Sequence, residues 1–118
     1  MHVMRTDEVA AEEVQSALFT GGRVTRQPLV TSEISNNFTL GMVNFSPGAR
    51  NLFHTHTSDQ VLLVTGGTGI VATKSEQQVV TEGAVIHIPA GEMHWHGATE
   101  DSAFSHISLT AMGSRTDY

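Results

Sequence analysis

The stretch Gly48-Ala-Arg-Asn-Leu-Phe-His54-Thr-His56-Thr-Ser-Asp-Gln60 constrains the fold more than any other part of the chain. On an extended strand alternate side chains share a face, so the imidazoles of His54 and His56 lie on one side, with Cα atoms about 7 Å apart. Both can then reach a single metal ion, and Gln60 has the same parity four residues further on. An isolated His-x-His pair is more often an accident of sequence than a ligand pair, so the surrounding spacing has to decide.

A second histidine-bearing stretch is Gly83-Ala-Val-Ile-His-Ile-Pro89-Ala-Gly91-Glu-Met-His94-Trp-His96-Gly-Ala98. His94 comes 34 residues after Gln60 and beyond a proline–glycine turn, which places it on a separate strand. Six of the seven histidines fall between residues 54 and 106, and histidine is the commonest metal ligand in proteins. Three imidazoles and one amide oxygen would leave open positions on a six-coordinate ion, as a catalytic metal requires.

Short β-type segments recur along the rest of the chain, separated by glycine, proline and small polar residues. The expected strands are Arg23–Val30, Phe38–Phe45, Arg50–His56, Gln60–Thr65, Gly69–Thr73, Gln78–Val80, Ala84–Ile88, His94–Gly97 and Ala103–Ala111. Many short strands at regular spacing predict an all-β sandwich or barrel. Residues 7–19 form a short helix or an irregular arm, so we expect an N-terminal arm at residues 1–22 and a single domain at 23–118.

Composition excludes several classes of protein. The 118 residues include 39% hydrophobic and 15% charged residues, which is typical of one folded domain. The formal net charge of −6 disfavours nucleic acid and anionic membranes as partners. The absence of cysteine excludes disulfides, zinc–thiolate sites, iron–sulfur clusters and thiol nucleophiles. No apolar run approaches a spanning helix and the N-terminus lacks the apolar core of a signal peptide, so we expect a cytoplasmic protein.

The two histidine-bearing stretches resemble the two motifs of the cupin superfamily. The first matches G-x5-H-x-H-x3-E-x6-G up to Gly67, except that Gln60 stands in place of glutamate. The second matches G-x5-P-x-G-x2-H-x3-N, except that Ala98 stands in place of asparagine. The motifs span residues 48–98 and agree at eight of ten positions. The resemblance implies a double-sheet, jelly-roll-like β-barrel with one metal in its mouth, commonly dimeric, and it assigns His54, His56, Gln60 and His94 as ligands.

Gln60 changes what such a site would do. Its amide oxygen is a neutral but hard donor, so a divalent ion held by three histidines and a glutamine keeps its full charge. Such an ion should be a strong Lewis acid and should favour an anionic exogenous ligand. Imidazole and oxygen donors without sulfur suit a divalent transition metal; we expect manganese, with iron, nickel, cobalt or zinc as alternatives.

Further residues are candidates for substrate contact and proton transfer. His96 shares the face of His94 on an extended segment, and His106 lies on Ala103–Ala111, a strand that lines the cavity in cupins. Either could be the base. On Phe38–Phe45 the face of Thr39, Gly41, Val43 and Phe45 should point inward, although a one-residue slip would place Leu40 and Met42 there instead.

A narrower resemblance is to the small manganese-dependent cupin hydroxynitrile lyases of bacteria. These also use three histidines and a glutamine, and the sequence His94-Trp95-His96-Gly97-Ala98 followed by His106 looks like theirs. The resemblance implies that His106 is the base and that Gly41, Val43 and Thr110 line the pocket. We therefore expect a lyase acting on a small hydroxy or carbonyl compound. The alternatives are a cupin dioxygenase using iron or another divalent metal, and a non-catalytic binding module.

The run Val61-Leu62-Leu63-Val64 bears on oligomeric state. A half-buried strand alternates apolar and polar residues, whereas a continuous apolar run indicates that both faces are covered. One face would line the barrel interior and the other would meet a second sheet or subunit. This favours a homodimer or higher homo-oligomer.

Overall fold

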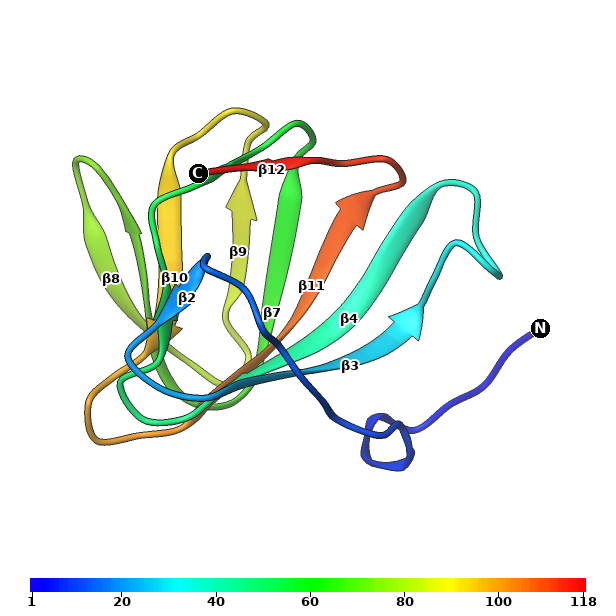
Figure 1. Ribbon diagram of the computed structural model, residues 1–118, viewed down its shortest axis with the longest axis horizontal. Helices are drawn as coiled ribbons and strands as arrows, with labels where there is room; N and C mark the ends of the chain where they lie inside the picture. Colours follow the sequence, from blue (N-terminus) through cyan, green and yellow to red (C-terminus); the bar gives the residue numbers. More distant parts are fainter.

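The computed structural model describes residues 1–118 and consists of β-strands with one short 3-10 turn, Thr6–Glu8. The strands are β1 (Glu12–Glu13), β2 (Phe19–Thr20), β3 (Val24–Val30), β4 (Phe38–Phe45), β5 (Arg50–Asn51), β6 (Thr55–His56), β7 (Gln60–Thr73), β8 (Gln77–Thr81), β9 (Val85–Ile88), β10 (His94–Ala98), β11 (Phe104–Ala111) and β12 (Thr116–Asp117). They curl into an open barrel (Figure 1), which confirms the expected all-β fold. No helix has the length and apolar character needed to cross a bilayer.

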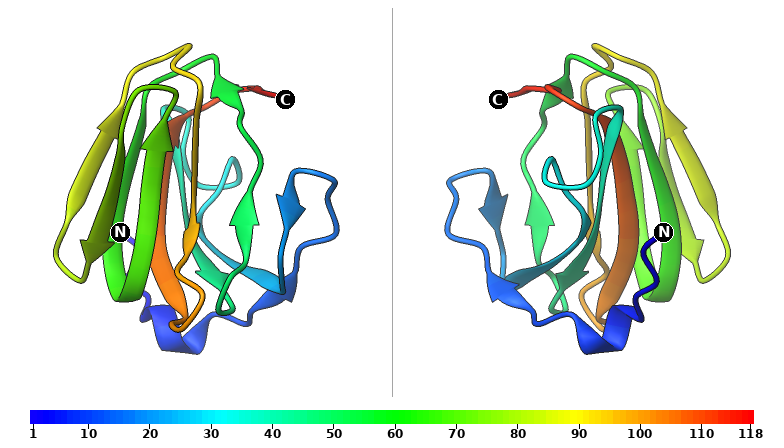
Figure 2. Two further views of the ribbon diagram at one scale, coloured as in Figure 1. Left: turned by 90° about the vertical axis from the view of Figure 1, so that its left-hand side faces the viewer. Right: turned by 90° about the vertical axis from the view of Figure 1, so that its right-hand side faces the viewer.

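Two antiparallel sheets face each other and share β7. The first half of β7 pairs with β11 and β9, and β11 continues through β4 to β3 and β1. The second half of β7 pairs with β8 and β10, and β10 continues through β5 to β2. Figure 2 shows β8 and β9 on one side of the barrel and β2 on the opposite side. The barrel wall is therefore continuous through β7 and open at its edges.

The sequence predicts that a strand ends at the glycine pair Gly66-Gly67. Instead, the pair lies inside β7. Gly67 has φ +72°, and a Cβ there would stand 1.8 Å from the carbonyl oxygen of Ala103. The register between β7 and β11 also shifts at this point. Because only glycine tolerates this conformation and this contact, the pair bends β7 so that it passes from one sheet to the other.

The segment Arg50–His56 is not the single strand that the sequence predicts. It divides into β5, which pairs with β10 and β2, and β6, which pairs with β12. Between them His54 exchanges both backbone hydrogen bonds with His94, at 2.9 and 3.0 Å. The chain changes its pairing strand within a few residues. The alternation of side chains along a strand does not indicate which other strand it pairs with.

The N-terminal segment is an arm rather than a helix beyond its 3-10 turn. Its two short strands extend the two sheets, since Glu12 pairs with Arg26 and Phe19 with Asn51. The side-chain amide of Gln27 donates to the carbonyl oxygens of Thr6 and Val9, at 2.7 and 2.9 Å, and holds the arm against β3.

An apolar core fills one end of the barrel. Its buried members are Val24, Phe45, Ala49, Val64, Ala98 and Phe104. Phe45 and Phe104 are 2% and 1% exposed, with ring centroids 5.9 Å apart. This packed end leaves the other end of the barrel free for polar side chains.

The strand Val61–Val64 has one fully covered face. Leu62 and Val64 are 0% and 2% exposed and point into the barrel, whereas Leu63 is 40% exposed on the outside. The outward neighbours of Leu63 are Ile107 on β11 and Val85 on β9, and Ile107 in turn pairs with Met42 on β4. An apolar outer face therefore runs across this sheet.

Candidate functional site

A cavity of about 530 Å³ opens at the end of the barrel away from the apolar core. The imidazoles of His54, His56, His96 and His106 and the amide of Gln60 lie in its wall. These side chains come from β6, β7, β10, β11 and the segment between β5 and β6, so the site exists only once both sheets have formed.

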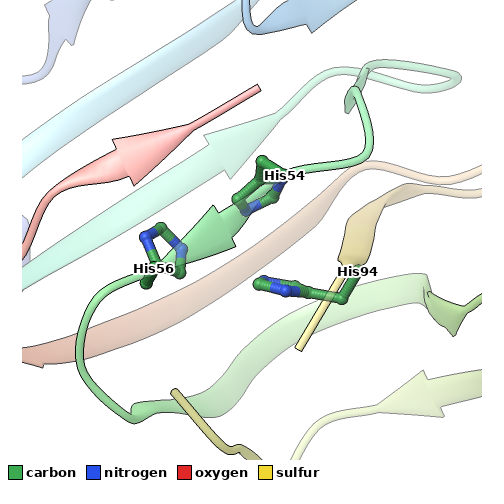
Figure 3. Close-up of side chains that lie close together, drawn as sticks. All are labelled: His54, His56 and His94. Carbon is green, nitrogen blue, oxygen red and sulfur yellow. The ribbon is translucent and has the colours of Figure 1, made fainter. Parts of the chain in front are cut away.

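Three of these histidines converge on one point (Figure 3). One ligand atom from each of His54, His56 and His94 lies within 4.8 Å of the other two. The Nδ1 atoms face the carbonyl oxygen of Leu52 at 2.7 Å, the hydroxyl of Thr116 at 3.0 Å and the carbonyl oxygen of Glu92 at 2.8 Å. A carbonyl oxygen only accepts, so His54 and His94 each carry their proton on Nδ1 and present a lone pair at Nε2. Such outer hydrogen bonds commonly orient metal-binding histidines.

Gln60 completes a set of converging electron-pair donors. Its Nε2 donates to the hydroxyl of Ser108 at 2.8 Å, and this bond turns its Oε1 toward the histidines. Oε1 lies 3.2 Å from Nε2 of His94. That nitrogen also carries a lone pair and no proton. Two acceptors repel one another unless a cation lies beside both. Ligand atoms about 2.1 Å from one ion and at right angles lie about 3 Å apart, so this spacing fits adjacent ligands of a metal.

His56 supports the same conclusion. Its Nε2 is buried and has no hydrogen-bond partner, although buried polar atoms are almost always paired. A metal ion would satisfy it together with the lone pairs of His54 and His94. The residues present therefore fit a divalent metal with three nitrogen donors and one oxygen donor.

The electrostatic environment keeps these imidazoles neutral. Burial, opposed in part by the hydrogen bond to Leu52, lowers the pKa of His54 to about 4. The pKa of His56 is lowered by burial and then by the neighbouring His94, and burial also lowers the pKa of His94. Neutral imidazole is the form that binds a metal, so the ligands are ready for binding near pH 7.

A second, fully buried pair of imidazoles lies beside the ligands. Nε2 of His106 is 3.1 Å from Nδ1 of His96. Asn51 contacts His96 twice, because its Oδ1 accepts the backbone N–H of His96 at 2.8 Å and its Nδ2 lies 3.3 Å from Nε2 of the ring. The first bond fixes the amide orientation, so Nδ2 can only donate to the ring. The same Nδ2 lies 3.5 Å from Nδ1 of the ring, and the direction of the hydrogen bond between His96 and His106 depends on which ring nitrogens carry the protons.

Burial governs the protonation of this pair too. It lowers the pKa of His106 to about 4, and it lowers the pKa of His96 well below its usual value, with the nearby His106 adding to the effect. Phe45 packs against both rings, with centroids 6.0 Å from His96 and 5.6 Å from His106. Near neutral pH both imidazoles are uncharged and can accept a proton.

The comparison with protein families identifies the fold. A model described as "Cupin domain" matches residues 41–109. The chain belongs to the cupin family. This confirms the resemblance carried by the two histidine-bearing motifs, and the matched residues contain every residue of the candidate metal site.

Individual cupins agree with this assignment. The chain is 32% identical over 110 residues to an (R)-mandelonitrile lyase from Granulicella tundricola, an alignment that covers 92% of this chain and 83% of the relative. Among solved structures, a cupin-like protein from Thermotoga maritima superposes with a TM-score of 0.83 at 32% identity, over 90% of this chain and 82% of the other. The polyketide cyclase RemF from Streptomyces resistomycificus superposes with a TM-score of 0.85 at 19% identity, over 100% and 86%, which shows the cupin fold alone.

Of the four residues that the sequence assigns to substrate contact, Gly41 and Val43 on β4 and Thr110 on β11 lie in the cavity wall. Thr39 on β4 lies there too, and its hydroxyl is 3.2 Å from that of Thr110. The odd-numbered face of β4 is therefore the inward one. Phe45 has the same parity but is not in the cavity wall. It lies deeper, where the barrel narrows onto Phe104 and Val64, and it supports His96 and His106 from below.

Four residues that matter to this cupin site carry no signal in the sequence. Asn51 and Ser108 position His96 and Gln60, and Thr116 accepts or donates at His56. Arg26 lies in the cavity wall. Asn51, Ser108 and Thr116 are ordinary polar residues until strand pairing brings each beside a partner 45 to 60 residues away. Only parity on β11 could have pointed to Ser108.

Proposed function

We propose that this cupin is a metal-dependent lyase that cleaves cyanohydrins to a carbonyl compound and hydrogen cyanide, and that catalyses the reverse addition. The proposal rests chiefly on one observation: neutral donors suited to a divalent metal, of which His54, His56 and Gln60 line the cavity, lie beside an uncharged imidazole pair in the same cavity wall. The similarity to an (R)-mandelonitrile lyase supports the choice of reaction.

The residues of this chain divide the work between binding and proton transfer. His54, His56, His94 and Gln60 would hold the metal, which we propose to be manganese. When bound, a divalent ion supplies Lewis acidity toward an oxygen of the substrate. Because Gln60 contributes no charge, these four ligands would not reduce the Lewis acidity of the ion.

His106 acts as the base. It takes the proton from the hydroxyl group of the cyanohydrin, and the bond between the carbinol carbon and the nitrile carbon breaks with its electron pair leaving on cyanide. The carbon–oxygen unit becomes a carbonyl, and cyanide recovers the proton from His106. A pKa of about 4 leaves His106 unprotonated at neutral pH, and its contact with His96 allows the transferred proton to be shared between the two rings.

The test is cleavage of racemic mandelonitrile by the manganese-loaded full chain, followed by the absorbance of benzaldehyde. His54→Ala removes a ligand, and His106→Gln keeps the cavity filled while removing the base. We expect cleavage by the wild type, none above background in His54→Ala, and a loss of at least 100-fold in kcat for His106→Gln, as for a general base. A fully metal-loaded wild type with no activity would overturn the proposal.

We also propose that the protein is a homodimer, formed through the apolar outer face that contains Leu63, Val85 and Ile107. Support comes from the exposure of Leu63 and Val85, 40% and 67%, in the middle and at the edge of that sheet. Contiguous apolar surface of this kind marks contact with another protein.

A further inference from the structure

The cavity wall has an unusual charge balance. Arg26 is the only arginine or lysine that lines it, and no aspartate or glutamate does. The chain as a whole carries a net charge of −6. The acidic residues are therefore outside the cavity, and its interior is positive relative to the rest of the molecule.

The position of Arg26 follows from the strand register. It lies on β3 opposite Val43 of β4, which lies opposite His106 of β11. Its Cα is thus two strand spacings, about 10 Å, from that of His106. All three residues face the cavity.

The guanidinium group extends over Gly41. Its Nη2 lies 3.9 Å from the point where a Cβ on Gly41 would stand. Gly41 is in register with Ser108, whose hydroxyl accepts the hydrogen bond from Gln60. The arginine therefore points along the cavity toward the metal ligands, and the missing side chain at position 41 leaves it room.

Arg26 has no protein partner. The three ion pairs of the molecule join Arg5 to Asp7, Arg23 to Glu13 and His87 to Asp59. Glu12 is paired with Arg26 across β1 and β3, yet the two form no ion pair. Arg26 is an exposed residue of β3 that lines the cavity, and its side chain donates to no group of the protein.

We propose that Arg26 binds a carboxylate on the substrate, so that the natural substrate is a hydroxynitrile or carbonyl compound with a carboxylate remote from the reacting carbon. The substrate class rests on the proposed function, whereas the anion-binding role of Arg26 stands apart from it. A guanidinium pairs with a carboxylate through two parallel hydrogen bonds. A divalent ion held by neutral ligands would supply one positive anchor and Arg26 supplies another, and no acidic side chain lies in the cavity wall between them.

The hydroxyl groups between the anchors are consistent with such a substrate. Thr39, Thr110 and Ser108 line the inward faces of β4 and β11. These hydroxyl groups can form hydrogen bonds with a polar molecule that extends from the candidate metal ligands to Arg26. Thr39 and Thr110 bond to one another and Ser108 accepts from Gln60, and each hydroxyl keeps further hydrogen-bonding capacity for a polar ligand.

The test is binding of 4-formylbenzoate and of its uncharged isostere 4-formylbenzamide to the manganese-loaded full chain, measured by titration calorimetry. We expect the wild type to bind the carboxylate about tenfold more tightly than the amide, as for a charge-assisted hydrogen bond at a partly exposed site. Arg26→Met should abolish the preference, and Arg26→Lys should retain part of it. Lys74→Gln removes an equal charge from an exposed turn away from the cavity and should leave the preference unchanged.

The outcomes separate this proposal from the proposed function. Equal affinities in the wild type, or a preference that survives in Arg26→Met because the carboxylate binds the metal instead, would overturn the role of Arg26. A wild type that prefers the carboxylate but cleaves no cyanohydrin would refute the lyase while leaving Arg26 as an anion-binding residue. Unchanged melting temperatures for the Arg26 variants show that a loss of binding is not a loss of folding.

Discussion

The candidate metal ligands of this cupin are oriented by hydrogen bonds on the side of each side chain away from the site. Leu52, Glu92 and Thr116 contact the Nδ1 atoms of the three histidines, and Ser108 turns the amide of Gln60. These protein contacts therefore hold the donor atoms in a converging arrangement. Preorganisation of this kind lowers the cost of ordering the ligands on binding.

Gln60 offers a direct test of the charge argument. Gln60→Glu should retain manganese, because a carboxylate oxygen also suits the ion, but it places a negative charge beside the open coordination positions. We expect azide and cyanide to bind at least tenfold more weakly than to the wild type, since about 1.4 kcal/mol of repulsion is enough for that ratio. The measurement is anion titration followed by electron paramagnetic resonance of the bound manganese. Equal anion affinities in the two proteins would remove the role we give to the neutral amide.

At the scale of the strands, the shape of the site depends on a bend within β7 and on hydrogen bonds that join loops to neighbouring turns. The bend in β7 requires Gly67, because its φ is positive and a Cβ would overlap the carbonyl of Ala103. Gly67→Ala should lower the free energy of unfolding by about 3 kcal/mol or more. Gly66→Ala is the matched control, since a Cβ there meets nothing within 4 Å, and it should change stability little. Urea denaturation of both variants measures this, and equal midpoints would contradict the assignment of the bend to Gly67.

The loop that carries the chain from β9 to His94 is tied to the turn before β7. Asp59 accepts from Nε2 of His87 at 2.8 Å and from the backbone N–H of Ala90 at 3.0 Å. These two bonds lower the pKa of Asp59, so its carboxylate is charged at neutral pH. The same turn leads directly into Gln60, which makes Asp59 a positioning residue for two ligands on different elements.

Asp59→Asn should therefore weaken manganese binding by about two- to fivefold, the range expected for an exposed pair. The kcat per bound metal should stay unchanged, because Asp59 does not touch the cavity. Isothermal titration with manganese gives the affinity, and Glu76→Gln, at an exposed turn elsewhere, serves as the control. An unaltered affinity would show that the loop holds its place without this contact.

At the scale of the whole molecule, the buried histidines make stability depend on pH. His106 has a pKa of about 4 when folded, against about 6.5 when unfolded. As the pH falls below 6.5 the unfolded chain takes up a proton that the folded protein does not, so the free energy of unfolding decreases until the pH reaches about 4. For His106 this amounts to about 3 kcal/mol.

The apo protein should accordingly melt at a lower temperature at pH 4.5 than at pH 7. His106→Leu, which keeps an apolar side chain in the same space, should show a shallower decrease over that range. Calorimetric melting at several pH values measures both. The same slope in wild type and variant would mean that His106 does not carry the effect.

The oligomeric state is also decided at the scale of the whole molecule. If the outer face is a dimer interface, Leu63→Lys should give a monomer at micromolar concentration, because it buries a charge at the centre of that face. Val79→Lys places the same charge on β8, outside that face at a residue 65% exposed, and should leave the dimer intact. Light scattering on a sizing column distinguishes the two, and a monomeric wild type would dismiss the interface.

The sequence by itself determined the fold class of this cupin and pointed to its candidate metal ligands. His54, His56, Gln60 and His94 follow from motif spacing and from the period of two along a strand, both of which are local properties. Gly41, Val43 and Thr110 follow from the same parity, once one phase of the strand is chosen.

Only the tertiary structure decided which residues support and surround those ligands. Asn51 meets His96, Ser108 meets Gln60, and Arg26 shares a cavity with His106 because strands distant in sequence are paired in one register. Parity alone could not separate Phe45 in the core from Val43 in the cavity wall, since depth along the barrel depends on how both sheets close. Register and closure are set by many contacts across the sheets, and no short stretch of sequence contains them.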